Sequence, residues 1–407
     1  MAADPRLSRG ANIMMRLVST PTLTGPWPAV STTALVATVT VMPGFTVGAL
    51  AAPIAADLHI SHTSLGLAMS AFYAATALGS PAATRLAAAL PVPLILATAG
   101  IAASTVMITL SRTTGFATLL AVLIAGGFTN GLVQPAAGRV IATRIPVRRR
   151  SLAAGLVGAA LGAATLVPGL LVAFVLPSHG WRTAMCIAGL VALLPVVFTG
   201  ATRCMNSPLP LRPVAAGSHT PHVRRILLLW ALAAGLSATG NNAVASYFIQ
   251  LGQHSGTAAS VAGNLLATSA ILAVVVRLVT GALSDRAPSH NPAVITAMML
   301  AGALGLASIA VGTPAMFVSG AVLAFSAGWG WTGLLLATTL HLLPGRAEKA
   351  GHTVQVGIYT GATIAPFAFG ALASAFGFTV ASAMAAALGL AAAAAMALGI
   401  RLLHSRT

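Results

Sequence analysis

Long apolar segments alternate with short polar ones along almost the whole chain. Most apolar segments run for 20 residues or more with no acid in the middle, enough for a helix to cross the roughly 30 Å hydrocarbon layer of a membrane. The pattern therefore predicts an all-α integral membrane protein with twelve transmembrane helices. The expected spans are 28–55, 63–85, 92–111, 115–142, 151–176, 182–203, 225–250, 257–282, 292–312, 314–341, 351–374 and 378–402.

The composition agrees with a membrane protein and excludes several other classes of protein. Of the 407 residues, 57% are hydrophobic and 6% are charged, whereas a soluble domain carries about 25% charged residues. The net charge of +17 does not indicate nucleic-acid binding, because the basic residues lie at the ends of apolar spans rather than on one polar face. The four acids (Asp4, Asp57, Asp285 and Glu348) are too scattered for a metal-dependent membrane enzyme, and no loop is long enough for a receptor domain. We expect neither a metal nor a cofactor.

The positions of the basic residues predict the orientation. If the N-terminus is cytosolic, nineteen of the 21 lysines and arginines fall on the cytosolic side, and only Arg112 and Arg182 fall outside. The positive-inside rule then places both termini in the cytosol of a multi-pass cell-membrane protein. The chain divides into a tail (1–27), a six-helix bundle (28–203), a proline-containing cytosolic linker (204–224) and a second six-helix bundle (225–407).

The two predicted bundles resemble each other in their glycines. Glycines of spans 2 and 4 recur 202 residues later, and a Gly-x-x-x-Gly pair of span 5 recurs 199 residues later in span 11. These matches are Gly79 with Gly281, Gly126 and Gly131 with Gly328 and Gly333, and Gly158 and Gly162 with Gly357 and Gly361. Two repeats of parallel topology are typical of transporters with a site between the halves. We expect the Gly-x-x-x-Gly pairs to serve close helix packing.

Arg277 is the candidate for substrate binding that the charge pattern singles out. It precedes Asp285, at the end of span 8, by eight residues, which is about 12 Å of helical rise into the membrane. An arginine there costs about 2.5–3.5 kcal/mol and usually faces water, a partner or a substrate. No span supplies a buried carboxylate for it, so its possible partners are carbonyl groups, water or an anionic ligand. The alternative is an arginine that extends its head group to the membrane surface.

Uncharged polar residues within the spans extend this candidate site. Asn130 and Gln134 share one helix face at i, i+4, and so do Gln355 and Tyr359. The other candidates for substrate binding are Tyr73, Asn241 and Asn242. The alternative for each is an interhelical hydrogen bond worth about 0.6 kcal/mol.

Several motifs resemble those of the major facilitator superfamily over nearly the whole chain. The loop Gly281-Ala-Leu-Ser-Asp285-Arg286 is similar to the family's Gly-x-x-x-Asp-Arg motif, and Gly180-Trp181-Arg182 before span 6 is also common there. The resemblance implies a cavity among spans 1, 2, 4, 5, 7, 8, 10 and 11. Gly281, Asp285 and Arg286 are expected to form a gate, because Asp285 lies at the cytosolic edge on the same side as the loop with Arg346 and Lys349; a solvated loop aspartate is the alternative. Arg277 falls where monocarboxylate and oxalate transporters of the family place an anion-binding arginine.

Two departures from the family pattern bear on coupling. The first-half loop Gly79–Arg85 lacks the aspartate, and span 4 has Leu123 where the family has an arginine linked to proton coupling. Residues 328–333 and span 11 look most like the cyanate- and nitroimidazole-type branch.

We therefore predict a secondary transporter that moves a small organic or inorganic anion by alternating access. The alternative is efflux of a neutral or hydrophobic compound, with Arg277 structural. Because no acid or histidine lies at mid-membrane, we expect uniport or exchange rather than obligatory proton symport. The expected partners are a small-molecule substrate and the lipid bilayer, and we expect a monomer.

Overall fold

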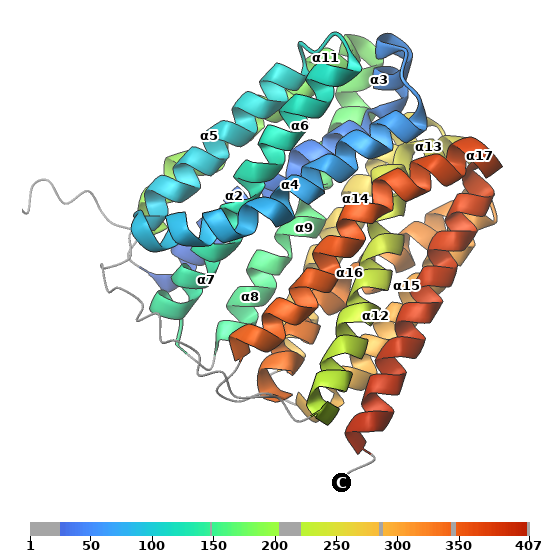
Figure 1. Cartoon of the computed structure of the whole chain (residues 1–407). Helices are drawn as coiled ribbons and strands as arrows, with labels where there is room; N and C mark the ends of the chain where they lie inside the picture. The colour runs from blue at the N-terminus through green and yellow to red at the C-terminus, as the bar shows by residue number, and fades with distance from the viewer. Residues whose placement is uncertain (1–24, 147–148, 203–220, 285–287, 343–346, 405–407) are drawn as a thin grey trace, which may run out of the picture.

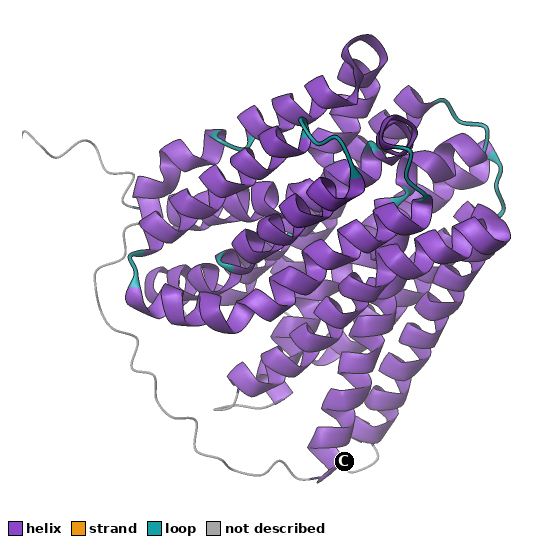
Figure 2. Ribbon diagram, turned by 45° about the horizontal axis from the view of Figure 1, so that its top comes forward, coloured by secondary structure: helices purple, strands orange, loops and turns teal. Residues whose placement is uncertain are grey.

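The structure, a computed structural model, describes residues 25–146, 149–202, 221–284, 288–342 and 347–404. Helices joined by short loops make up nearly all of this part, and it contains no strand (Figure 2). Large apolar side chains lie exposed on its outside, among them Leu78 (77% exposed), Val197 (80%) and Phe174 (67%). A surface of this kind needs an apolar surrounding, and helices satisfy their own backbone groups within it.

The first half of the fold consists of six crossings between residues 26 and 202. They are α2 (Pro26–Ala49) with α3 (Ala51–Leu58), α4 (His62–Ala89), α5 (Val92–Leu110), α6 (Phe116–Gly131) with α7 (Val133–Arg144), a broken crossing of α8 (Arg150–Gly158), α9 (Ala160–Ala163), α10 (Leu166–Leu170) and η2 (Leu171–Val175), and α11 (Leu176–Val191) with η3 (Leu194–Thr202).

The second half repeats the arrangement between residues 221 and 404. Its crossings are α12 (Pro221–Ser246) with α13 (Phe248–His254), α14 (Ala259–Ser284), then after η4 (Pro288–His290) α15 (Asn291–Ala310), α16 (Pro314–Leu342), and α17 (Ala347–His404), which holds the last two. Nine segments in the part of the chain that the structure describes are long and apolar enough to span a membrane, and two of these hold two crossings each. With the less apolar α4, the predicted twelve-helix, all-α membrane fold is confirmed.

Backbone geometry shows that the two halves are repeats. Gly180 breaks α11 at φ 72°, and Gly377 breaks α17 at φ 83°, left-handed conformations that glycine adopts without strain. The two glycines are 197 positions apart (377 minus 180), and so are the positive-φ residues His59 and Gly256. The starts of α3 and α13 are separated by the same number.

The spacing of 197 corrects the register expected from the glycine pattern. At this spacing Gly281 corresponds to Thr84, five positions beyond the expected Gly79. The earlier match depended on residue type alone, and glycine is frequent in this chain. Equivalent backbone breaks define the correspondence between the repeats better, because they mark where the chain turns in each half.

The bundle has two distinct ends (Figure 1). At one end, here called the linker end, η3 finishes, α12 begins, and α17 both begins and finishes. The opposite end, here called the closed end, carries α3, α13 and the breaks at Gly180 and Gly377. In Figure 1 the closed end is at the top and the C-terminus at the bottom.

The two halves press together at the closed end through small residues. Gly48 of α2 lies against the backbone of Ser246 in α12, and Gly66 of α4 lies against Pro366 of α17. The equivalent of the second contact, 197 positions shifted, joins Gly263 of α14 to Gly169 of α10, where an added Cβ would lie 2.6 Å from a carbonyl oxygen. Small residues let backbones approach this closely.

Hydrogen bonds cross the same interface. The Tyr247 hydroxyl donates across it to the His62 carbonyl at 2.8 Å, and within the second half to the Pro366 carbonyl at 3.3 Å. Gln250 donates to the Gly48 carbonyl at 3.3 Å, and the Phe367 amide donates to Ser70 at 3.0 Å. The described contacts that join the two halves at the closed end are thus close packing and uncharged hydrogen bonds.

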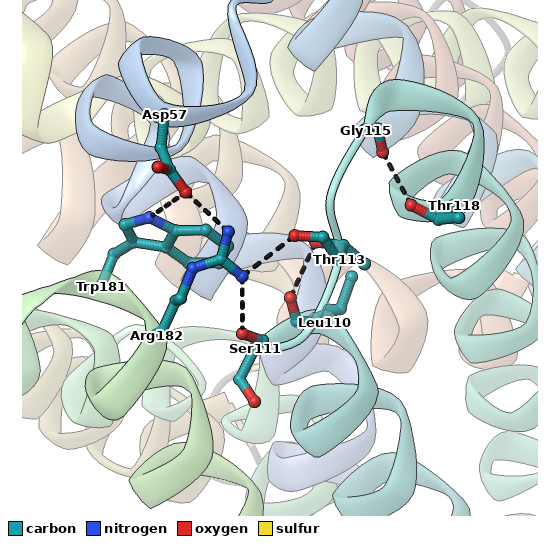
Figure 3. Close-up of polar contacts among 8 residues, drawn as sticks. All are labelled: Asp57, Leu110, Ser111, Thr113, Gly115, Thr118, Trp181 and Arg182. Carbon is teal, nitrogen blue, oxygen red and sulfur yellow. Dashed lines mark hydrogen bonds and ion pairs between the residues drawn. The ribbon is translucent and has the colours of Figure 1, made fainter.

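An ion pair fixes the loops of the first half at the closed end (Figure 3). Arg182 donates to Asp57 at 2.7 Å and to the carbonyls of Ser111 and Thr113 at 3.0 Å each. The Trp181 indole also donates to Asp57, and the guanidinium lies 4.4 Å from its ring centre. At the equivalent positions His254 bonds Thr379 at 3.2 Å, so an uncharged contact replaces the ion pair in the second half.

Candidate functional site

A cavity of about 260 Å³ lies between the two halves. Its walls come from α2, α4, α6, α7, α8, α9, α12, α16 and α17, so both repeats contribute. It extends from Tyr73 and Asn242 in the interior to Ile141, Ala154 and Val354 near the linker end. The mainly apolar lining with a few polar groups is usual for a small-molecule site.

Six of the eight side chains predicted to bind substrate meet in this cavity. They are Tyr73, Asn130, Gln134, Asn242, Gln355 and Tyr359. Thr76 and Thr332 join them, which sequence reasoning did not single out, because threonine hydroxyls commonly bond their own helix backbone. No charged residue belongs to the lining that the structure describes.

Most polar groups of the cavity have partners within the protein. Asn130 donates to the Thr76 hydroxyl at 3.2 Å, and Thr76 donates to the carbonyls of Phe72 and Gly127. Tyr359 and Gln355 are hydrogen-bonded to each other, as expected for residues one turn apart. These contacts hold the side chains in place around the cavity.

Asn241 lies outside the cavity. It is 5% exposed and donates to the carbonyl of Gly328 at 2.6 Å and to the Ser237 hydroxyl at 3.3 Å. Its neighbour Asn242 faces the cavity because successive helical residues point about 100° apart. Asn241 therefore joins α12 to α16 within the second half, the interhelical role that the sequence left open for it.

Arg277 also lies outside the cavity lining, immediately behind it. It is 3% exposed, and its Nε donates to the Trp329 carbonyl at 2.9 Å. Its Nη1 donates, also at 2.9 Å, to the carbonyl of Gly158, which itself lines the cavity. The guanidinium carbon lies 5.7 Å from the Trp329 ring centre. Arg277 thus bonds the second half to the first through carbonyls.

Arg277 retains unused binding capacity. Its Nη2 is buried without a hydrogen-bond partner. The ion pair of Asp57 with Arg182 is at the closed end, and in the described part of the chain no carboxylate pairs with Arg277. A buried guanidinium that only carbonyls hold keeps its full positive charge close to the cavity.

Gly162 both makes room for this arginine and packs α9 against α14, where a Cβ would lie 3.2 Å from Ala273 Cβ, whereas a Cβ at Gly158 would meet open space. A Cβ at Gly162 would lie 3.1 Å from Arg277 Nη1, so the glycine leaves room for the guanidinium. Gly357 and Gly361 both pack a helix, because their faces lie against the backbone of α12 at Ala231 and Gly235.

The residues predicted to form a gate are only partly described. Gly281 lies in α14 with open space around the position of a Cβ. Asp285 and Arg286 lie outside the described residues. The closed-end contacts of Tyr247 and Gln250 join the two halves, and sequence reasoning gave these two residues no gating role, because a pairing across the halves has no local sequence signal.

Comparison with known folds gives two similar solved structures. Both are of a bacterial homologue of the human lysosomal transporter Spinster in an inward-facing conformation. The unoccupied form has a TM-score of 0.69 at 16% identity, covering 95% of this chain and 98% of that one. The occupied form has a TM-score of 0.67 at 17% identity, covering 91% and 96%. At such identity the likeness shows the fold.

Comparison of sequences identifies the family. No curated protein matches the chain. The family model described as Major Facilitator Superfamily matches residues 33–352, which is more than half of the chain. A cavity between two six-helix repeats that are closed at one end fits the alternating-access transport of a small solute, the activity of this family. This multi-pass membrane protein, a secondary transporter rather than an enzyme, belongs to the major facilitator superfamily.

Proposed function

We propose that the protein carries a small organic or inorganic anion across the cell membrane, with the cavity as its binding site. The observation that carries this proposal is Arg277, whose guanidinium bonds a carbonyl of the cavity wall and has no carboxylate partner among the described residues. In surroundings of low dielectric constant, this charge raises the potential inside the cavity. An anion is therefore attracted there and a cation is repelled.

Arg277 lies behind the cavity lining, so direct contact with the anion requires the guanidinium to reach into the cavity when the anion binds. Nη2 of Arg277 has no partner, and a planar guanidinium suits a carboxylate better than the point charge of lysine does. A charge-assisted hydrogen bond contributes about 1.5–3 kcal/mol, and 1.4 kcal/mol is one decade in affinity. Loss of the guanidinium is thus expected to weaken anion binding at least about tenfold.

The test measures ligand-induced thermal stabilisation of the purified protein, because a ligand that binds the folded state alone raises stability. Cyanate, lactate and succinate are the anionic probes, and lactamide is a neutral one. Arg277→Ala is expected to fold and to lose the stabilisation by anions, and Arg277→Lys to recover part of it. Arg85→Ala, at an exposed position of α4, removes the same charge away from the cavity and serves as the control.

A neutral or hydrophobic solute is the second candidate, and the uncharged lining favours it. In that case Arg277 joins the halves and does not attract the solute. Unchanged binding of anions by folded Arg277→Ala, or stabilisation by neutral compounds alone, overturns the anion proposal in favour of this one. Cyanate also tests the resemblance of residues 328–333 to the cyanate-type branch.

A further inference from the structure

Two polar atoms of the cavity residues stand apart from the rest because they are buried without a hydrogen-bond partner. They are the hydroxyl of Tyr73, from the first half, and Oδ1 of Asn242, from the second half. The residues are 5% and 1% exposed. Buried polar groups are usually paired in native proteins, and an exception calls for an explanation.

The orientation of the Asn242 amide follows from its surroundings. Its Nδ2 donates to the carbonyl of Ala238 at 2.9 Å. A carbonyl only accepts, so the amide nitrogen has to face it and Oδ1 has to face elsewhere. Oδ1 therefore offers an acceptor that a donor on another molecule can satisfy.

The Tyr73 hydroxyl has no packing role that the ring alone does not supply. The ring makes edge contacts with Phe45 and Phe72, at centroid distances of 6.3 and 5.2 Å. Phenylalanine makes the same contacts without burying a polar atom. In addition, a Cβ at Gly44 would lie 3.3 Å from the hydroxyl, so a glycine leaves space beside it.

We propose that these two groups form a subsite for a hydroxyl or primary amide group of the solute. The Tyr73 hydroxyl donates to that group, and Oδ1 of Asn242 accepts from it. A carboxylate only accepts, so it satisfies Tyr73 alone. Because both residues line the same cavity, a single solute bound at this subsite joins the two halves.

The inference rests on the proposed function and narrows its substrate class. The charge of the solute is attracted by Arg277, and its hydroxyl or amide binds at Tyr73 and Asn242. The substrate is then a hydroxylated or amidated organic anion rather than a plain carboxylate. A site built to bond a hydroxyl discriminates against an analogue that lacks it, because the protein groups are then left unpaired.

The experiment compares acids that differ only by a hydroxyl group. Dissociation constants of the purified full chain are measured for lactate and propionate, 3-hydroxybutyrate and butyrate, and malate and succinate. We expect the hydroxylated member of at least one pair to bind about tenfold more tightly. Tyr73→Phe and Asn242→Leu are expected to bring that ratio close to one, because each lowers the affinity for the hydroxylated acid more than the affinity for the plain acid.

Tyr247→Phe is the matched control, because it removes a tyrosine hydroxyl that has partners and lies outside the cavity. Tyr247→Phe is expected to change the dissociation constants of both acids of a pair by the same factor. Equal binding within every pair, or a ratio that survives Tyr73→Phe, overturns the inference. Absence of acid binding together with equal binding of glycerol and 1,3-propanediol also overturns it.

The outcome separates the inference from the proposal on which it rests. If all acids bind equally and Arg277→Ala abolishes their binding, the anion proposal stands and the subsite is wrong. If the acids do not bind but glycerol binds better than 1,3-propanediol, and Tyr73→Phe removes the difference, the subsite stands and the anion proposal is wrong.

Discussion

Arg277 of α14 occupies space that Gly162 of α9 leaves open: a methyl group on that glycine would lie 3.1 Å from Nη1. Shifted by 197 positions, Arg277 corresponds to Ser80, and Gly158 and Gly162 correspond to Gln355 and Tyr359. In one case the large residue is on α14 and the two small ones are on α8 and α9. In the equivalent case the small residue is on α4 and the two large ones are on α17. The repeats share a backbone but place polar groups differently.

The first prediction concerns the space that Gly162 leaves for the Arg277 guanidinium. Gly162→Val is expected to push the guanidinium away from the Gly158 carbonyl and to destabilise the protein by about 1–3 kcal/mol, the usual effect of overpacking. Anion affinity is expected to fall together with stability. Gly155→Ala is the control, since a Cβ there meets its nearest atom at 3.9 Å. Thermal unfolding and anion binding measure both effects; equal behaviour of the two variants contradicts the prediction.

The second prediction concerns the closed end. A Cβ at Gly263 would lie 2.6 Å from the Gly169 carbonyl and 2.9 Å from the Ala173 amide nitrogen, and backbone atoms cannot move aside as side chains do. Gly263→Val is therefore expected to hold this end open and to stop exchange.

Labelling measures this opening. With Cys186 and Cys204 replaced by alanine, Thr63→Cys reports on the interface, because Thr63 bonds Ser374 across it. Its labelling is expected to be faster in Gly263→Val than in Gly200→Ala, where a Cβ meets open space. Slow labelling with normal transport would show that the glycine contact is not needed for closure.

The third prediction compares the two members of the ion pair at the closed end. Asp57 and Arg182 are both about half exposed, and such pairs contribute roughly 0–1 kcal/mol, so Asp57→Asn is expected to cost less than about 1 kcal/mol. Arg182→Ala also removes bonds to the Ser111 and Thr113 carbonyls and is expected to cost about 1–3 kcal/mol. Thermal unfolding ranks the variants, and the reverse order would contradict this account.

The fourth prediction concerns orientation. Single cysteines at positions 10, 215 and 405, in a chain without its native cysteines, are expected to resist an impermeant reagent added to intact cells. His179→Cys, exposed at the closed end, is expected to react. The physical reason is the concentration of arginine at the linker end. The opposite labelling pattern would reverse the proposed topology.

The fifth prediction concerns coupling. The described lining of the cavity contains no aspartate, glutamate or histidine, the groups that usually form a proton relay. Counterflow in reconstituted vesicles is therefore expected to continue after the proton gradient is collapsed. Loss of both counterflow and net flux at every pH without a gradient would indicate obligatory proton coupling.

The sequence by itself determined the class of protein and the number of crossings. Repeated apolar segments of about 20 residues predict membrane-spanning helices, and the length and composition of each segment can be read directly from the sequence. Local polarity also singled out Tyr73, Asn130, Gln134, Asn242, Gln355 and Tyr359, which meet in the cavity, because polar side chains within membrane helices rarely face lipid.

The tertiary structure alone decided what each polar group touches. Asn241 and Asn242 are adjacent in the chain, yet one bonds the Gly328 carbonyl and the other lines the cavity. Arg277 has its carbonyl partners 52 and 119 residues away, and the role of Gly162 depends on that arginine. Such pairings follow from how the repeats pack, a long-range property that residue type and spacing along one helix do not encode.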